Sequence, residues 1–316
     1  MRAIVMDRFG GPEVLRAADM PVPKPTEHDV LVQVTYAAVN PVDWKIREGE
    51  LKDALPHQFP LIPGWDMSGI VIAVGTDVSL WKPNDRVYAY CRKPVVQMGA
   101  YAEFITLPET QVARMPKNLG FRDAAVIPLC ALTAWQALFD VAHLQPNETI
   151  LIHAGAGGVG SFAIQLAHNL GAGVITTASL RNHELVRSLG AMHAIDYSRE
   201  DIAKSTRAVT AQGVDVVFDL IGGEVQEKSF AALKPGGRLV SALSMPDAAL
   251  AAKYSVTPLQ VFAAPNVPQL TELATQFDDG RLKIPMIREY DLKDAAAAQS
   301  LSQTGHVQGK IVLKVK

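Results

Sequence analysis

Residues 150–167 read ILIHAGAGGVGSFAIQLA, and this stretch decides the fold. Its first residues, Ile150 to Ile152, form an apolar run that is typical of a buried strand. The glycines that follow let the backbone turn tightly and approach a ligand, and the residues from Ser161 onward have helical spacing. A strand, a glycine-rich turn and a helix in this order predict a dinucleotide site, with the first helix amides facing a pyrophosphate. The alternative is a tight strand–helix turn that binds no ligand.

The sequence on both sides of this stretch continues with strand and helix signals in alternation. Strand-like apolar runs at 174–177, 214–219 and 238–241 are separated by segments with helical spacing, such as 182–189. Such alternation predicts a parallel sheet that is covered by helices on both faces. We therefore assign residues 119–263 to a Rossmann-type domain with a doubly wound parallel sheet.

The residues outside this block differ from it in composition and in hydrophobic pattern. Residues 1–118 are rich in Pro, Gly and Val, and short alternating runs predict strands that are joined by tight turns. Residues 264–316 return to short elements and end on a strand-like run at 310–315. The sequence therefore predicts an α/β protein in which the block 119–263 is inserted into a β-rich domain made of 1–118 and 264–316.

The composition excludes several functional classes. The chain of 316 residues is 48% hydrophobic and 20% charged, with a net charge of −2. No basic excess suggests a nucleic-acid surface, and no apolar run is long enough to insert into a membrane. The N-terminal stretch does not resemble a signal peptide, and Cys91 and Cys130 are the only cysteines. We therefore expect free thiols and a cytoplasmic location.

The end of the strand after the glycine turn distinguishes the two nicotinamide dinucleotides. An NAD site has Asp or Glu at this point, which accepts hydrogen bonds from the ribose hydroxyls. This chain has Ser179, Arg181 and Asn182 instead, and Tyr197 follows the next strand. Hydroxyl and guanidinium groups bind the extra phosphate that a carboxylate would repel, so the sequence predicts NADP(H). The alternative for Arg181 is a solvated charge at a helix start.

A second polar segment, AAVNPVDWKIREG at residues 37–49, follows an alternating strand in the β-rich domain. The pair Asn40-Pro41 indicates a turn, and Asp43, Trp44 and Lys45 follow within five residues. Such a concentration of polar groups beside an apolar strand has three interpretations: a surface turn, a substrate site, or a metal site that has lost its metal.

Several segments together resemble a known family. The stretches NPVDWKIREG, PLIPGWDMSGIVIAVG, PLCALTAWQAL, GAGGVG and GHVQGKIVLKV occur in the order found in the medium-chain dehydrogenase/reductase superfamily. Within it the chain is most similar to the zinc-free NADPH:quinone oxidoreductase branch, which includes zeta-crystallin, and the resemblance covers almost the full length. It implies a GroES-like β-rich domain, an inserted Rossmann domain and a homodimer. It also implies NADPH-dependent reduction of small quinones or α,β-unsaturated carbonyl compounds.

The resemblance implies cofactor-binding residues, motif by motif. They comprise pyrophosphate and ribose contacts in the glycine turn, adenosine-phosphate contacts, an adenine wall, and contacts at the nicotinamide end. In this order they are Ala156, Gly157, Gly158 and Val159; Ser179 and Tyr197; Leu220 and Ile221; and Thr133, Phe262, His306, Val307 and Gln308.

The zinc alcohol dehydrogenases of the same superfamily provide a contrast. Their catalytic zinc needs three protein ligands and an open position. This chain has Asn40 at the first ligand position, Trp65 at the second, and Cys130 one residue away from the third. These side chains do not make a zinc site, so we expect no metal and interpret Cys130 as a core residue. The remaining alternatives are a zinc-type alcohol dehydrogenase and an NADPH-binding protein with little turnover.

Without a metal, the hydride acceptor must itself be electron-poor, as quinones and enones are. We expect Asn40 to donate a hydrogen bond to the developing oxyanion, and Lys45 to stabilise that charge or to pass a proton. The indoles of Trp44 and Trp65 would form apolar walls for a flat substrate. Related quinone oxidoreductases have tyrosines at the positions of Lys45 and Leu51, so the proton donor is not fixed by the resemblance.

Each of these candidates also has a simpler interpretation. Asn40 would then only cap the turn at Pro41, and Trp44 would pack in the core. Asp43, a further candidate for catalysis, would form an ion pair with Lys45 or Arg47.

Overall fold

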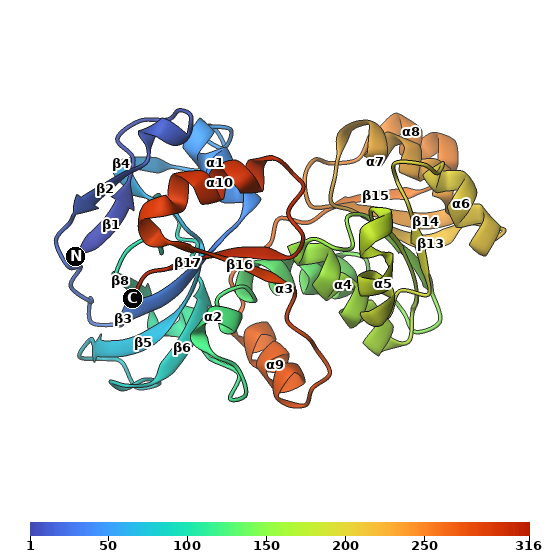
Figure 1. Ribbon diagram of the computed structural model, residues 1–316. Coiled ribbons are helices and arrows are strands. Elements are labelled where there is room, and N and C mark those ends of the chain that lie inside the picture. The colour runs from blue at the N-terminus through green and yellow to red at the C-terminus, as the bar shows by residue number, and fades with distance from the viewer. The chain divides into compact units, whose positions relative to one another are not determined.

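A computed structural model describes residues 1–316 and divides the chain into two compact units (Figure 1). The first unit consists of Met1–Leu129, Ala264–Gly280 and Met286–Lys316, and the second of Cys130–Ala263 and Arg281–Pro285. The boundary expected from the sequence, after residue 118, lies before the one in the structure. Residues 119–129 belong with the first unit because Ser68 Oγ donates to the Phe121 carbonyl at 2.6 Å, and the Leu129 amide donates to Asp66 at 2.8 Å.

The first unit is built on a seven-stranded sheet. Its order is β16-β17-β3-β5-β6-β9, and β8 also pairs with β3. The last strand of the chain, β17, lies antiparallel beside β3, so segments from the N-terminal and C-terminal parts of the sequence meet in one sheet (Figure 1). The strands are β3 (Asp29–Val39), β5 (Asp66–Val74), β6 (Arg86–Tyr90), β8 (Phe104–Pro108), β9 (Ala113–Arg114), β16 (Ile287–Asp291) and β17 (Lys310–Lys314).

Two small ribbons and several short helices complete this unit. The ribbons pair β1 (Arg2–Val5) with β2 (Arg16–Asp19), and β4 (His57–Ile62) with β7 (Val96–Met98). The α-helices are α1 (Pro41–Glu48), α2 (Phe121–Ala124), α9 (Val267–Asp278) and α10 (Ala295–Gln303), and the 3₁₀ turns are η1 (Pro12–Val14), η2 (Glu109–Gln111) and η6 (Leu292–Asp294). Apolar side chains from β3, β5, β17 and α10 form one core.

The segment after Asn40 is a helix and not the turn that the Asn-Pro pair indicated. Asn40 has extended backbone angles at the N-cap of α1, and Pro41 occupies the first helical position. Proline is favourable there because its ring fixes a helical φ and the missing N–H has no partner in the first turn. Gly49 ends the helix with φ +79°. Residues 43 to 47 therefore lie on successive helical positions, not on a loop.

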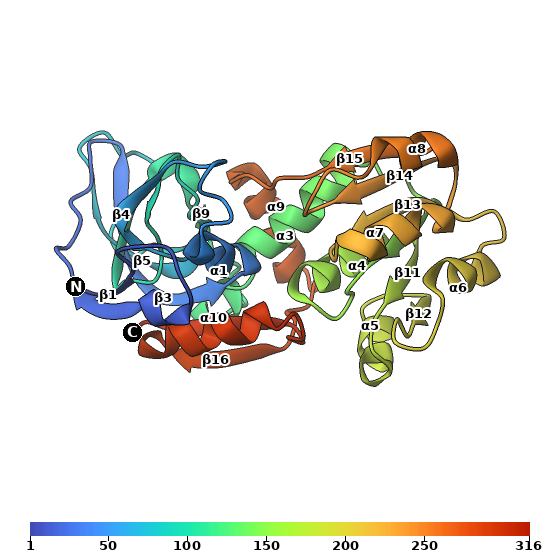
Figure 2. The same ribbon diagram turned by 90° about the horizontal axis from the view of Figure 1, so that it is seen from above.

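The second unit contains a six-stranded sheet with the order β12-β11-β10-β13-β14-β15, in which every neighbouring pair is parallel. Figure 2 labels β12, β11, β13, β14 and β15 of this sheet in the same order. The order reverses between β10 and β13, and ligands of such sheets bind beyond the carboxyl ends of the strands at this point. The strands are β10 (Thr149–Ile152), β11 (Gly173–Thr177), β12 (His193–Ile195), β13 (Val214–Asp219), β14 (Leu233–Ser241) and β15 (Thr257–Gln260).

Helices connect these parallel strands, so the α/β prediction is confirmed. They are α4 (Gly158–Leu170), α5 (His183–Ser188), α6 (Ile202–Val209), α7 (Gly223–Ser229) and α8 (Ala248–Tyr254), with 3₁₀ turns η4 (Leu180–Asn182) and η5 (Phe230–Ala232). Helix α3 (Pro128–Trp135) begins in the first unit and continues into the second, where a π-helical turn, η3 (Gln136–Val141), follows it. No helix of the structure is long and apolar enough to span a bilayer.

Candidate functional site

The glycine turn connects β10 to α4 in a cramped space. Ala154 has φ +51°, which reverses the chain directly after the strand. A Cβ on Gly155 would lie 2.1 Å from Thr176 Oγ1, and a Cβ on Gly160 would lie 2.3 Å from the Ala154 carbonyl oxygen. Only glycine fits at these two positions, and the result is a bare backbone at the N-terminus of a helix of 13 residues. This is the arrangement that binds pyrophosphate.

A buried histidine that the sequence reading did not single out supports this turn. His153 follows β10, and burial lowers its pKa to about 4, so the ring is neutral near pH 7. Ser229 Oγ donates its hydrogen to the Val225 carbonyl, so we assign the hydrogen on His153 Nε2 to the 2.7 Å contact with Ser229 Oγ. Nδ1 then accepts from Thr177 Oγ1, which in turn accepts from the Ala154 amide. This chain of hydrogen bonds fixes the first residue of the glycine turn.

The residues expected to select the cofactor lie at the ends of β11 and β12. Ser179 is half-buried and its Oγ accepts from Asn182 Nδ2 at 3.1 Å, while Asn182 itself is buried. The Arg181 side chain is exposed, and Tyr197 is 51% exposed. No carboxylate stands at the tip of β11. The carboxyl ends of parallel strands share one edge, so these groups and the glycine turn belong to the same edge of the sheet.

Asp219 orders the corresponding segment after β13. Its carboxylate accepts hydrogen bonds from the amides of Ile221 and Gly222, from Gln226 Nε2 and from Ser241 Oγ. The segment that it holds contains Leu220, which is half-buried, and Ile221, which is 50% exposed. Asp219 is a supporting residue that sequence reasoning passed over as the end of a strand.

The residues expected at the nicotinamide end fall into both units. Thr133 is buried on α3, and Phe262 is 55% exposed directly after β15; both belong to the second unit. His306, Val307 and Gln308 lie between α10 and β17 in the first unit. The structure therefore groups Thr133 and Phe262 with the glycine turn in one folding unit, and assigns the tail segment to the other.

Asn40 belongs to a buried polar network of the first unit. Its Nδ2 donates to Asp66 at 2.9 Å, and its Oδ1 accepts from the ammonium of Lys310 at 2.5 Å. Lys310 also donates to the Val39 carbonyl at 3.0 Å. The side chains of Asn40 and Asp66 are fully buried, and Lys310 is 4% exposed. Buried charges are stable only when paired and hydrogen-bonded, so this network is a built feature of the fold.

Asp43 lies beside this network and not at the surface. Its Oδ2 accepts from the Asn40 backbone amide at 2.8 Å and from the Tyr101 hydroxyl at 2.9 Å. The expected ion pair with Lys45 or Arg47 is wrong, because Asp43 points into the core and Arg47 binds Glu48 and two glutamines of α10. Burial raises the pKa of Asp43 to about 7 and that of Asp66 to about 6, while nearby Lys310 opposes both shifts.

The aromatic and cationic candidates differ in exposure. Trp44 and Lys45 are half-buried neighbours on α1, and the Lys45 ammonium lies 5.6 Å from the Trp44 ring centre. The indole nitrogen of Trp44 is buried and has no hydrogen-bond partner. Trp65 is buried and packs against Tyr90, with ring centres 5.8 Å apart. Trp65 is thus a core residue of this unit, whereas Trp44 has an unused donor.

The three positions that correspond to zinc ligands do not fit a metal. The Oδ1 atom of Asn40 is held by an ammonium, whose positive charge would repel a zinc ion. The indole of Trp65 has no lone pair to offer, and Cys130 is buried on α3. Neither cysteine forms a disulfide.

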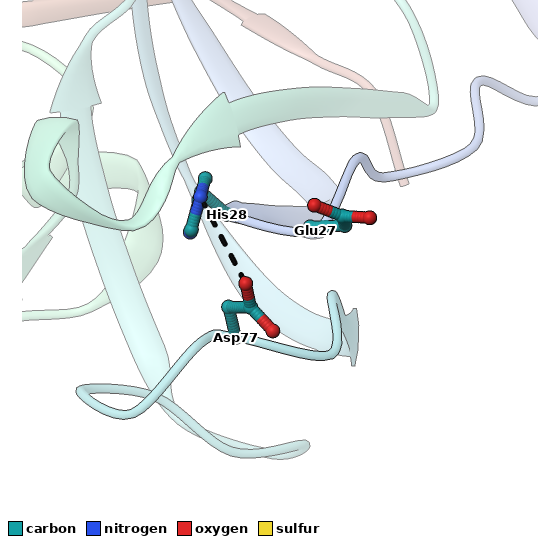
Figure 3. A group of neighbouring side chains, drawn as sticks. All are labelled: Glu27, His28 and Asp77. Atoms are coloured by element: carbon teal, nitrogen blue, oxygen red, sulfur yellow. Dashed lines mark ion pairs between the residues drawn. The ribbon is translucent and has the colours of Figure 1, made fainter.

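One surface cluster has the residue types of a metal site. Glu27, His28 and Asp77 converge where the chain enters β3 and leaves β5, and each offers a ligand atom within 4.8 Å of the others (Figure 3). The His28–Asp77 ion pair is long, at 3.9 Å, and these side chains are 71% and 54% exposed. Water solvates such groups well, so we assign no metal to this cluster.

Comparisons with known proteins agree with this geometry. The family model described as "Alcohol dehydrogenase GroES-like domain" matches residues 26–117, and the one described as "Zinc-binding dehydrogenase" matches residues 189–313. The chloroplastic NADPH-dependent alkenal/one oxidoreductase of Arabidopsis thaliana is 36% identical over 99% of this chain and 79% of its own length. The chloroplast envelope quinone oxidoreductase homolog of the same plant is 31% identical over 99% of this chain and 98% of its own.

Solved structures give the same result. The quinone oxidoreductase from Coxiella burnetii superposes with a TM-score of 0.90 at 36% identity, covering 100% of this chain and 99% of the other. The Escherichia coli quinone oxidoreductase complexed with NADPH gives a TM-score of 0.89 at 28% identity, covering 99% and 100%. A GroES-like unit with an inserted Rossmann unit defines a dehydrogenase/reductase architecture. The chain belongs to the medium-chain dehydrogenase/reductase superfamily, in the branch of the quinone oxidoreductases.

Proposed function

We propose that this protein is an NADPH-dependent enzyme that transfers a hydride to quinones or reactive α,β-unsaturated carbonyl compounds without a metal. The observation that carries the proposal is the edge of the six-stranded sheet. There the glycine turn is followed by Ser179 and Arg181 and not by a carboxylate. Relatives that are named alkenal/one oxidoreductase and quinone oxidoreductase support the substrate class.

The second unit, which contains Cys130–Ala263, would hold the cofactor, which supplies a hydride when bound. Ala156, Gly157, Gly158 and Val159 form the bare turn that suits a pyrophosphate. Ser179, Arg181, Asn182 and Tyr197 would bind the adenosine phosphate, and Leu220 would cover the adenine side. Thr133 and Phe262 would contact the nicotinamide end. The family resemblance assigns the same role to His306, Val307 and Gln308.

The substrate side of the reaction needs a donor toward the oxygen that gains negative charge. Asn40 is the residue that we propose for this role, because its side-chain amide is a hydrogen-bond donor and its Oδ1 is fixed by Lys310. Asp43 holds the start of α1 through the Asn40 amide, so we assign it a positioning role.

Lys45 and Trp44 are the remaining candidates on α1. The Lys45 ammonium is only half-buried and can exchange protons with solvent, so we propose it as the proton source for the reduced product. The unpartnered indole N–H of Trp44 would orient a carbonyl group of the substrate. Trp65 would support this region from the core.

We further propose that the enzyme is a cytoplasmic homodimer. Two buried cysteines that form no disulfide support a reducing compartment. The edge strand β15 supports the dimer, because an uncovered strand edge offers backbone groups to a second copy.

An NADPH-oxidation screen with small quinones and enones tests the proposed function. We expect turnover with at least one electron-poor acceptor, weaker turnover with NADH, and no zinc by elemental analysis of the active protein. No oxidation with any acceptor would favour a binding protein, and one tightly held zinc per active chain would favour an alcohol dehydrogenase.

A further inference from the structure

An open cavity lies at the edge of the six-stranded sheet where β11 begins, opposite the edge that holds the glycine turn. Its volume is about 490 Å³, which is within the range of small-molecule sites. Gly173 and Val174, the first residues of β11, line it together with the C-terminal turns of α4 and α5 and with Arg281 and Lys283. All of these residues belong to the second unit. The cavity is therefore separate from the proposed cofactor-binding edge, although β11 reaches both.

Hydrogen bonds from α4 hold the segment 281–283 at one wall of this cavity. The buried side chain of Gln165 donates to the Lys283 carbonyl at 3.1 Å and accepts from the Lys283 amide at 2.7 Å. Asn169 Nδ2 donates to the Arg281 carbonyl at 2.9 Å. These bonds use backbone atoms of the segment, so they place Arg281 and Lys283 at the cavity without engaging the charged group of either residue.

A glycine brings the opposite wall close. Gly190 has φ +113°, and a Cβ on it would lie 2.4 Å from His168 Cγ. Only glycine lets the chain that leaves α5 pass so near to α4. As a result Arg187, in the last turn of α5, and His168, in the last turn of α4, line the same cavity.

The lining of the cavity is basic. It includes Arg187, Arg281 and Lys283 and contains no Asp or Glu. Arg187 and Lys283 are exposed and form no ion pair with a carboxylate, whereas Lys234 and Arg238 of the same unit do. The helix dipole at the end of α5 favours a cation at Arg187, but Lys283 lies on no helix. Cations on a concave surface focus a positive potential, which attracts anions.

The cavity also has apolar walls. Val174 and Leu189 line it and are buried, and Met192, which also lines it, is 50% exposed. A methionine side chain adapts to the shape of an apolar partner. A ligand that combines an anionic group with an apolar body would therefore match both parts of the lining.

We propose that this cavity binds an organic phosphate, whose phosphate group contacts Arg187 and Lys283 and whose apolar body covers Met192. A phosphate monoester carries close to two negative charges near neutral pH, as several cations require, whereas a carboxylate carries one. The planar guanidinium of arginine also binds phosphate oxygens in pairs. This site is additional to the proposed function and does not depend on it.

Two double variants of equal net charge test the site. R187M/K283M removes two cations of the cavity, and K204M/K253M removes two exposed lysines of the same unit that do not line it. Arg187 and Lys283 are exposed, and Lys283 binds Gln165 only through its backbone, so we expect R187M/K283M to unfold at the wild-type temperature.

Phenyl phosphate is the probe, and inorganic phosphate is the comparison. We expect phenyl phosphate to shift the backbone amide resonances of Gly190 and Met192 in ¹H–¹⁵N spectra, with a dissociation constant of about 1 mM or less. Inorganic phosphate should bind at least about threefold more weakly, because it leaves Met192 uncovered. The affinity for phenyl phosphate should fall at least about tenfold in R187M/K283M and should not change in K204M/K253M.

The same spectra show which results contradict the site. Shifts confined to Gly157 and Gly158 would place all phosphate binding at the glycine turn and overturn the proposal. Equal losses in the two double variants would show an effect of net charge alone, and equal affinities for the two phosphates would exclude an organic ligand. None of these measurements needs turnover, so they decide the site even if the protein reduces no quinone or enone.

Discussion

Asn40, at the start of α1, has more than one structural role. Asn40 is the N-cap of the helix, the partner of a buried ammonium and the partner of a buried carboxylate. The sequence left a turn cap and a substrate donor as alternatives for this residue, and the structure makes them compatible. The cap is formed by backbone atoms and Asp43, so the side-chain amide is available to the charge network.

Substitution of Asn40 should therefore affect chemistry more than binding. We expect Asn40→Ser to lower kcat with an enone by about a hundredfold with little change in KM, because the amide that we propose as the donor to the developing oxyanion is lost. Steady-state kinetics with purified protein checks this. The control is Asn118→Ser, since the Asn118 amide donates a hydrogen bond to the Asp278 carbonyl but is exposed. Equal kcat values for the two variants would remove Asn40 from the mechanism.

The buried carboxyl of Asp43 should make stability depend on pH. Burial raises its pKa from the ordinary 3.8 to about 7, so between these values the folded state binds a proton that the unfolded chain has released. Folding is therefore favoured at low pH and loses this contribution as pH rises toward 7, by at most about 1.4 kcal/mol per pH unit. We expect urea unfolding from pH 4.5 to 7.5 to show a smaller decline in Asp43→Asn than in the wild type. Parallel pH profiles would contradict this assignment.

At the scale of elements, the function of the glycine turn depends on the absence of side chains. A Cβ at Gly160 would lie 2.3 Å from the Ala154 carbonyl oxygen, so any side chain forces the turn away from α4. We expect Gly160→Ala to weaken NADPH binding at least about tenfold, because the helix amides no longer converge on the pyrophosphate. Fluorescence titration measures this. Gly120→Ala is the control, since a Cβ there has open space, and it should bind as the wild type does.

The tip of β11 should set the choice between the two cofactors. A carboxylate at position 179 would repel the adenosine phosphate of NADPH and would accept hydrogen bonds from the ribose of NADH. We expect Ser179→Asp to shift the ratio of kcat/KM values toward NADH by about tenfold or more. The comparison needs both cofactors with one acceptor. A ratio that stays constant would show that Ser179 does not face the phosphate.

At the scale of the whole molecule, local patterns predicted the fold well because they depend on short-range periodicity. The alternation of strands and helices from residue 149 to 260 is visible in the sequence, and so is the glycine turn. The buried polar network of Lys310, Asn40 and Asp66 could not be predicted from the sequence. Two of its members are 270 residues apart, and they come together only because their strands pair in the sheet. The hydrogen bond between His153 and Ser229 could not be predicted either, because the two residues are 76 positions apart. Hydrogen bonds between polar residues that are far apart in the sequence leave no periodic pattern from which they could be predicted.

The proposed dimer makes a final prediction about β15. The Val261 amide bonds the Ser241 carbonyl of β14, and amides alternate along a strand, so those of residues 258 and 260 face outward. Pro258 has no N–H, which leaves Gln260 as the outward donor of this edge. We expect wild-type chains of 34.1 kDa to sediment as pairs, and Gln260→Pro to raise the dimer dissociation constant about tenfold.

Gln260→Ala is the matched control for this substitution. It removes the side-chain contact with the Leu243 carbonyl but keeps the backbone N–H, so the dimer should persist. Equal weakening by both variants would place the effect in the side chain and not in strand pairing. A wild type that sediments as single chains at micromolar concentration would refute the dimer itself, whereas a dimer that tolerates proline at position 260 would move its interface away from β15.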